Sequence, residues 1–110
     1  MSSKLLVVIA TGDREKAVAG LMYARNVLKY NWLDQVKVVF FGPSEKLAAN
    51  DKEIQYFMKE IAKETDCFAC KAISDKDRVS EKLEEAGVKV EYVGKVVSDA
   101  IKEGFHPMVW

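Results

Sequence analysis

The sequence predicts an α/β protein in which five short, mostly parallel strands form one sheet with helices on both faces, giving a three-layer sandwich. Three observations support this prediction. Short apolar runs rich in β-branched residues alternate with longer segments whose apolar residues recur every three or four positions. Glycine, proline or asparagine separates most of these segments, as in turns. A length of 110 residues suits one hydrophobic core, so we expect a single domain over residues 1–110.

The first half of the chain contains two expected strands and two expected helices. Leu5–Ala10 is a continuous apolar run, typical of a strand buried on both faces. Arg14–Tyr30 has the apolar spacing of a helix, and Val36–Phe41 is a second β-branched and aromatic run. A short turn capped by Ser44 is expected over 44–49. A helix capped by Asp51 and ending near Thr65 should follow.

The second half repeats this alternation. A short apolar strand is expected over 66–73, followed by a helix that begins at Ser74 or Asp75 and ends at Ala86. Residues 88–93 alternate between apolar and polar side chains, as a less buried strand does. A short helix over 95–103 and a last extended segment over 106–110 complete the chain.

Two residues indicate how these elements end and where they lie in the sheet. Gly87 follows the third main helix and is well placed to end it in the left-handed conformation. Pro107 cannot donate a backbone hydrogen bond, so it restricts the last strand to an edge of the sheet or to a strand's beginning. The polar face of 88–93 places that strand near an edge as well.

Composition excludes several function classes. Hydrophobic residues make up 49% and charged residues 31%, a balance typical of globular domains rather than disordered or membrane chains. Lys plus Arg equals Asp plus Glu at 17 each, so no net positive charge favours direct nucleic-acid binding. The first apolar run is too short for a signal sequence or membrane span. We expect a cytoplasmic protein with reduced thiols and no membrane partner.

Parallel sheets bind ligands beyond the carboxyl ends of their strands, which directs attention to four loops. Three of them contain candidate ligand-binding residues. These are Thr11, Gly12 and Asp13 in the first loop, Gly42 in the second, and Gly94 in the loop after the fourth strand. The first loop lacks both the dinucleotide pattern and the P-loop pattern, although the helix start after it could accept a small anion. The alternative for Gly12 is a tight turn with no ligand contact.

The fourth loop contains Cys70, one of two cysteines. Cys67 and Cys70 are three residues apart, so in one strand their side chains should point to opposite faces and form no disulfide. Cys67, in mid-strand, is expected to be a buried small hydrophobe. Cys70 precedes Lys71 and a helix start, which favour a thiolate, while Asp75 and Asp77 oppose one. A reactive thiol and an inert core thiol both remain open.

No metal or cofactor is expected. A structural zinc site needs four ligands, and the chain offers two cysteines and one distant His106. His106 next to Pro107 is interpreted as a strand-end residue rather than a catalytic base, although a Cys–His pair remains open.

The whole chain resembles the DsrE/DsrF-like family of small sulfur-relay proteins, which have a flavodoxin-like sandwich. The features that resemble this family are the apolar first strand with Ala10–Asp13, the segment 38–42, the strand end at Cys70, the segment 83–90 leading to Gly94, and the segment 100–105.

This resemblance implies that Cys70 accepts sulfane sulfur as a persulfide and passes it to a partner. Lys71 and Ser74, next to Cys70 and at the expected helix start, are the candidate supporting residues. It also implies a homo-oligomer, commonly a dimer, trimer or hexamer, that works with sulfur donor and acceptor proteins. The alternative function is a non-catalytic oligomeric module that holds a small anion or nucleotide near Thr11–Asp13.

Overall fold

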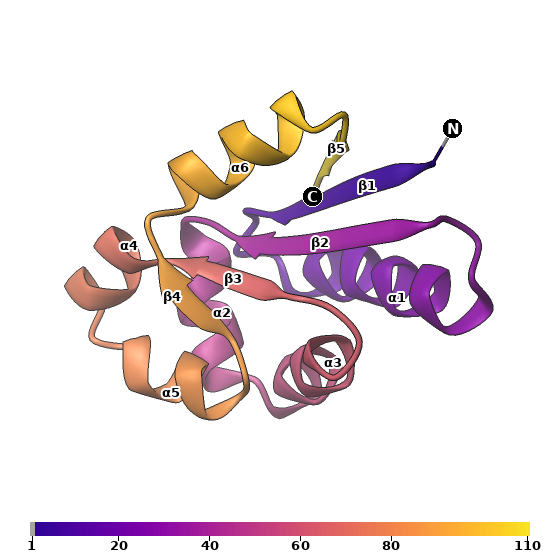
Figure 1. Cartoon of the computed structure of the whole chain (residues 1–110). Helices are drawn as coiled ribbons and strands as arrows, with labels where there is room; N and C mark the ends of the chain where they lie inside the picture. Colours follow the sequence, from indigo (N-terminus) through magenta and orange to yellow (C-terminus); the bar gives the residue numbers. More distant parts are fainter. Residues whose placement is uncertain (1) are drawn as a thin grey trace.

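Five strands and six helices alternate along residues 2–110, the part of the chain that the computed structural model describes (Figure 1). The strands are β1 (Lys4–Ile9), β2 (Gln35–Phe40), β3 (Cys67–Cys70), β4 (Lys89–Glu91) and β5 (His106–Val109). The helices are α1 (Arg14–Tyr30), α2 (Pro43–Asn50), α3 (Lys52–Ala62), α4 (Lys71–Lys76), α5 (Ser80–Glu85) and α6 (Val93–Lys102). All strand pairings are parallel, in the order β4-β3-β2-β1-β5.

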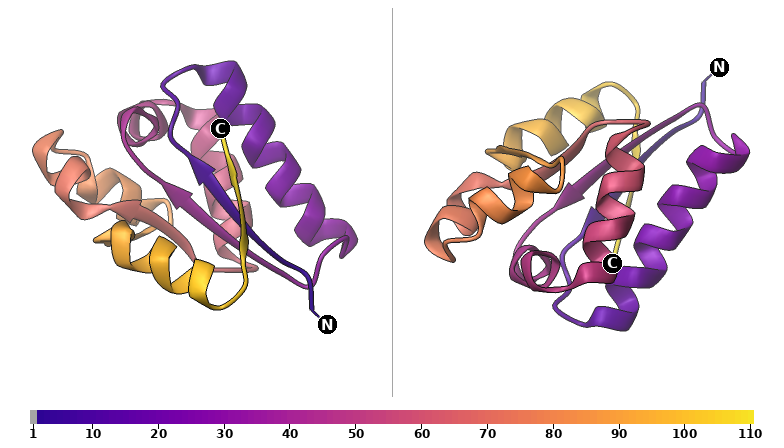
Figure 2. Two further views of the ribbon diagram at one scale, coloured as in Figure 1. Left: turned by 90° about the horizontal axis from the view of Figure 1, so that it is seen from above. Right: turned by 90° about the horizontal axis from the view of Figure 1, so that it is seen from below.

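The sheet separates two apolar clusters, which confirms the three-layer arrangement. On one face, alternate residues of the central strands pack with α1, α2, α3 and α5. On the other face, Leu6, Val8 and Val39 pack mainly with α6, through Val93 and Ala100. Figure 2 shows α6 alone above the sheet and α1 beside α3 below it. Burying both faces requires strands that are apolar on both sides, as in the near-continuous run of β1.

Both edge strands lie where the sequence predicts them. β4 forms one edge, and β5, which contains Pro107, forms the other beyond β1. Asp51 caps α3 as expected, because its carboxylate accepts a hydrogen bond from Ile54 N at 3.0 Å. Gly87 follows α5 with a φ of 90°, which confirms the left-handed helix end.

The segment after β3 differs from the prediction. β3 ends at Cys70, and Lys71–Ile73 begins α4 instead of extending the strand to residue 73. The reason is pairing: β2 pairs with β3 only as far as Ala69, and β4 only as far as Cys70. Backbone groups beyond that point have no strand beside them, so a helix supplies their hydrogen bonds.

The single helix expected over 74–86 is also wrong, because the segment forms α4 and α5 with a turn between them. Arg78 adopts a left-handed φ of 60°, which breaks the helical path. Ser74 and Asp75 therefore lie inside α4 rather than at a helix start. Residues 43–50 form a full helix where a short turn was expected, and Pro43 is its first residue, where a missing N–H has no cost.

No helix among residues 2–110 combines the length and the apolar character that crossing a membrane requires.

Candidate functional site at the carboxyl ends of the strands

The loops after β1 and β2 meet, as expected from the parallel sheet. Ser44 N donates to the carbonyl oxygen of Ala10 at 3.3 Å. A Cβ atom added to Gly12 would lie 3.2 Å from Cβ of Pro43, so the small residue allows the two loops to approach. The backbone N–H groups of Ala10 and Thr11 both donate to the carbonyl oxygen of Trp110. These amides are therefore engaged within the protein.

The start of α1 carries its own acidic cap. The carboxylate of Asp13 accepts a hydrogen bond from Lys16 N at 3.1 Å, and the Thr11 hydroxyl accepts one from Asp13 N at 2.9 Å. A helix N-terminus attracts anions, but a carboxylate already at that end competes with them. The anion or nucleotide site near Thr11–Asp13 stays a prediction, and this geometry adds no support to it.

The two cysteines point to opposite faces of the sheet, as predicted. Cys67 belongs to the cluster on the α1 side, is 1% exposed, and has its pKa raised by burial to about 12. Cys70 belongs to the cluster under α6 and is 7% exposed. It is the last residue of β3 and the N-cap residue of α4, so its sulfur lies at the strand-end edge. Cys67 is therefore an inert core thiol, and Cys70 is the candidate for chemistry.

Lys71 and Ser74, the residues expected to support Cys70, bind other groups. The ammonium of Lys71 lies 2.8 Å from the carboxylate of Asp75, which raises the pKa of the lysine. The Ser74 hydroxyl lies 2.7 Å from that of Ser80 and 3.4 Å from the carbonyl oxygen of Lys71. These contacts fix the turn between α4 and α5, where Ser80 also donates to Asp75.

Glu45 is the residue that sequence reasoning missed. Its side chain is fully buried, and one carboxylate oxygen accepts a hydrogen bond from Gly42 N at 3.1 Å, while the other has no partner within 3.5 Å among residues 2–110. Burial raises the pKa of Glu45 to about 7; the N–H groups of Gly42 and Cys70 lower it, and the charge of Asp77 raises it further. The spacing of Gly42 and Glu45 matches an N-cap and its third helical residue, which is the sequence signal for this contact.

A depression of about 360 Å³ lies beside these residues, between the start of α2 and α4. Its walls are Gly42, Pro43, Lys46, Ile73, Lys76 and Asp77. Ile73 also packs against the apolar cluster that contains Cys70, and Gly42 and Asp77 are neighbours of the Glu45 carboxyl. Neither Cys70 nor Glu45 lines the depression itself, but its walls contact the cluster that contains the thiol and the groups that surround the buried acid. Lys46 and Lys76 give its rim positive charge.

Gly94 is not brought into this group. It lies exposed inside α6, one residue after the helix begins, and a Cβ there would meet nothing within 4 Å. Within the described chain, no three side chains of the metal-ligating types gather closely enough to hold an ion.

Comparison with known proteins supports the fold. No protein-family model matches the sequence, and no curated protein matches it with significant similarity. A solved structure of a conserved protein of unknown function from Bacteroides thetaiotaomicron superposes with a TM-score of 0.84 and 24% sequence identity, covering 97% of this chain and 95% of that one. A protein of unknown function from Methanobacterium thermoautotrophicum gives a TM-score of 0.75 and 17% identity, covering 98% and 99%.

These similarities define a class: a small α/β protein with an all-parallel five-stranded sheet, to which nearly the whole chain belongs. They establish the fold, and the function has to be argued from the chain's own residues.

Proposed function

We propose that the protein carries sulfane sulfur as a persulfide on Cys70, as its resemblance to the DsrE/DsrF-like family implies. The observation that carries this proposal is the contrast between the two thiols. Cys67 lies in mid-sheet in the main core cluster, whereas Cys70 is the last residue of its strand, and Ile73, in the same apolar cluster as Cys70, lines a depression open to solvent. Reactive cysteines are found at strand or helix ends that a reactant can reach, while enclosed thiols are inert, so the proposal requires that the end of β3 opens to expose Cys70.

The chemistry requires no oxidant. The Cys70 thiolate attacks the terminal sulfur of a donor persulfide, R–S–SH, forming Cys70–S–SH and releasing the donor thiolate, R–S⁻. An acceptor thiolate then attacks the terminal sulfur of Cys70–S–SH, which regenerates the Cys70 thiolate. Each step forms one sulfur–sulfur bond and breaks one.

The depression supplies a direction of approach for the donor. Lys46 and Lys76 line it, and their charges attract an anionic persulfide, although Asp77 offsets part of this attraction. The apolar cluster under α6 surrounds the sulfur of Cys70 and limits its contact with water. Because Cys70 is only 7% exposed, transfer requires a small local opening, so we expect a slow reaction unless a partner protein promotes it.

The test is persulfide loading followed by intact-protein mass measurement. The wild-type protein, incubated with glutathione persulfide, should gain one sulfur atom. Cys70→Ala should gain none, and the matched control Cys67→Ala, which retains Cys70, should load like the wild type. Loading of Cys70→Ala to the wild-type level, or no loading of the wild type, would contradict the proposal.

We also infer that the protein forms a homo-oligomer. Met108 and Val109, consecutive residues of the edge strand β5, are 43% and 68% exposed, and adjoining exposed apolar residues mark protein interfaces. Figure 2 shows β5 uncovered on the side where α6 packs on the sheet, which leaves Val109 available to a second copy. Sulfur donor and acceptor proteins remain further proposed partners of the same site.

A further inference from the structure

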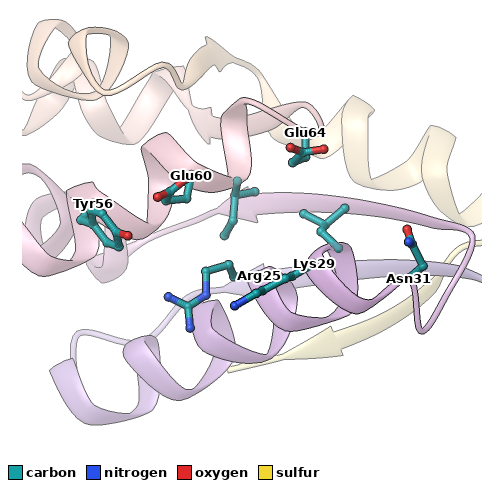
Figure 3. A pocket seen from close by; sticks show the side chains of 8 residues that line it. Arg25, Lys29, Asn31, Tyr56, Glu60 and Glu64 are labelled. Carbon is teal, nitrogen blue, oxygen red and sulfur yellow. The ribbon is translucent and has the colours of Figure 1, made fainter.

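A groove on the opposite face of the sheet from the Cys70 side chain lies between α1 and α3 and has a volume of about 590 Å³ (Figure 3). This volume is within the range of small-molecule sites. Leu28 and Ile61 give the groove an apolar floor, and the polar side chains of the two helices form its walls. Neither the sulfur chemistry nor the strand-end depression uses these residues.

The α1 wall is cationic. The guanidinium of Arg25 lies 4.9 Å from the ring centroid of Phe57, a cation–π contact that fixes the side chain in place. Among residues 2–110 its buried Nε atom has no hydrogen-bond partner, and its Nη2 atom lies 3.5 Å from Oδ1 of Asn26. Lys29 lies one turn further along the same wall, and Figure 3 shows both side chains directed into the groove. An acceptor such as a carboxylate would satisfy donors that this wall leaves free.

The α3 wall is anionic. It presents Glu60 and Glu64, with the Tyr56 hydroxyl beside them. A hydrogen bond to Glu60 raises the pKa of Tyr56, and the charge of Arg25 acts on it in the opposite direction. Lys63, the residue that follows α3, lies 3.7 Å from Glu60. Glu60 is thus held on its own wall, as Arg25 is held on the other.

The two walls do not neutralise each other. Within residues 2–110, no ion pair at 4.0 Å or less joins Arg25 or Lys29 to Glu60 or Glu64. Two cations, Arg25 and Lys29, therefore face two carboxylates, Glu60 and Glu64, across an apolar floor, with space between them. A purely anionic ligand would be repelled by the two glutamates, and a purely cationic ligand would be repelled by Arg25 and Lys29.

We propose that this groove binds a short zwitterionic peptide with apolar side chains, whose carboxylate contacts Arg25 and Lys29 and whose ammonium contacts Glu60 and Glu64. The apolar side chains would lie on Leu28 and Ile61. A dipeptide suits the site better than a single amino acid, because its charged termini are further apart and the walls are too distant to pair directly.

The test uses the dipeptide L-leucyl-L-leucine and three derivatives, with affinity measured by isothermal titration calorimetry. The dipeptide should bind with a Kd of about 1 mM or tighter. N-acetylation removes the ammonium and C-terminal amidation removes the charged carboxylate, and each should weaken binding about tenfold or more. The doubly blocked peptide should bind weakest.

Protein variants test the same contacts from the other side. Arg25→Met, which keeps the aliphatic stem, and Glu60→Gln should each weaken dipeptide binding about tenfold. Lys16→Met and Glu53→Gln, exposed on the same two helices but outside the groove, should bind like the wild type. Cys70→Ala should also bind normally, because the groove is independent of the sulfur site.

The proposal fails if the dipeptide shows no binding at about 10 mM. It also fails if the doubly blocked peptide binds as well as the zwitterion, because the charges would then be irrelevant. Tighter binding by the N-acetylated peptide would show an anion site instead, and unchanged affinity in both Arg25→Met and Glu60→Gln would place the peptide elsewhere.

Discussion

The buried carboxyl of Glu45 gives the most quantitative prediction. Replacing it with glutamine preserves its shape and keeps an oxygen that can accept the hydrogen bond from Gly42 N, now 3.1 Å away. It removes the ionisation of a side chain that has no exposed surface. The substitution therefore separates the charge of Glu45 from its packing.

The magnitude follows from the pKa of the buried group. Burial raises the pKa of Glu45 from 4.5 to about 7, so the folded protein holds this proton more tightly than the unfolded chain does. The stability that the tightly held proton gives the folded protein is fully present below the unfolded pKa of 4.5, and it is lost as pH rises through the folded pKa of about 7. One pKa unit corresponds to about 1.4 kcal/mol. Between about pH 5 and about pH 9, Glu45 should therefore cost the wild type about 2.5 kcal/mol.

The variant Glu45→Gln should lack this loss. By about pH 9 the whole shift from 4.5 to about 7 has been lost, about 3.4 kcal/mol. Allowing about 1 kcal/mol for poorer hydrogen bonding by the amide, the variant should exceed the wild type in stability by about 2.4 kcal/mol at that pH. At about pH 5, where Glu45 is mostly protonated, it should be equal or slightly less stable. Urea unfolding followed by circular dichroism at each pH measures the free energy of unfolding directly.

Glu85→Gln is the matched control, because Glu85 is exposed on α5. Its free energy of unfolding should follow the wild-type pH dependence throughout. If Glu45→Gln follows that dependence too, the carboxyl of Glu45 does not titrate in the way its burial demands, and the reasoning is refuted.

Three further predictions concern packing, capping and assembly. Gly20→Ala should destabilise the protein by about 1–3 kcal/mol, because the new Cβ would lie 2.7 Å from the ring of Trp110. Asp51→Ala removes the cap on Ile54 N and should cost about 1 kcal/mol. The hydrogen bond from Ile54 N and the nearby Arg14 guanidinium lower the pKa of Asp51. The stability that the ionised Asp51 gives the wild type is therefore present above the unfolded pKa and is lost as pH falls through the folded pKa. Val109→Lys should convert the wild-type oligomer into monomers, measured by light scattering.

Each of these outcomes has a direct contradiction. An unchanged urea midpoint in Gly20→Ala would mean that α1 moves to accommodate the added methyl group. An unchanged midpoint in Asp51→Ala would mean that the Asp51 cap adds nothing to the stability of the fold. A monomeric wild type, or a Val109→Lys variant with the wild-type mass, would count against assembly through β5.

The sequence predicted all five strands because their signals are local and strong. β1 and β2 are long apolar runs, and Pro107 correctly restricted β5 to an edge. The prediction of one helix over 74–86 was wrong because the turn that divides it has no sequence signal. The left-handed turn at Arg78 has no glycine or proline to mark it, so periodicity alone could not divide α4 from α5.

The candidate site was predictable only in part. The spacing of Cys67 and Cys70 was enough to place them on opposite faces, since side chains alternate along a strand. The engagement of Lys71 by Asp75 was not predictable, because that contact depends on α4 starting at residue 71.

The sequence by itself determined the alternation of strands and helices and the parallel sheet, because hydrophobic periodicity and turn residues act over a few neighbouring positions. Only the tertiary structure decided which charges are buried and which remain apart. Glu45 becomes a neighbour of Cys70 and Asp77 because α2 packs beside α4, and Arg25 faces Glu60 because α1 packs beside α3. Such contacts join residues distant in the chain, and their energies depend on desolvation that exists only once the core has formed.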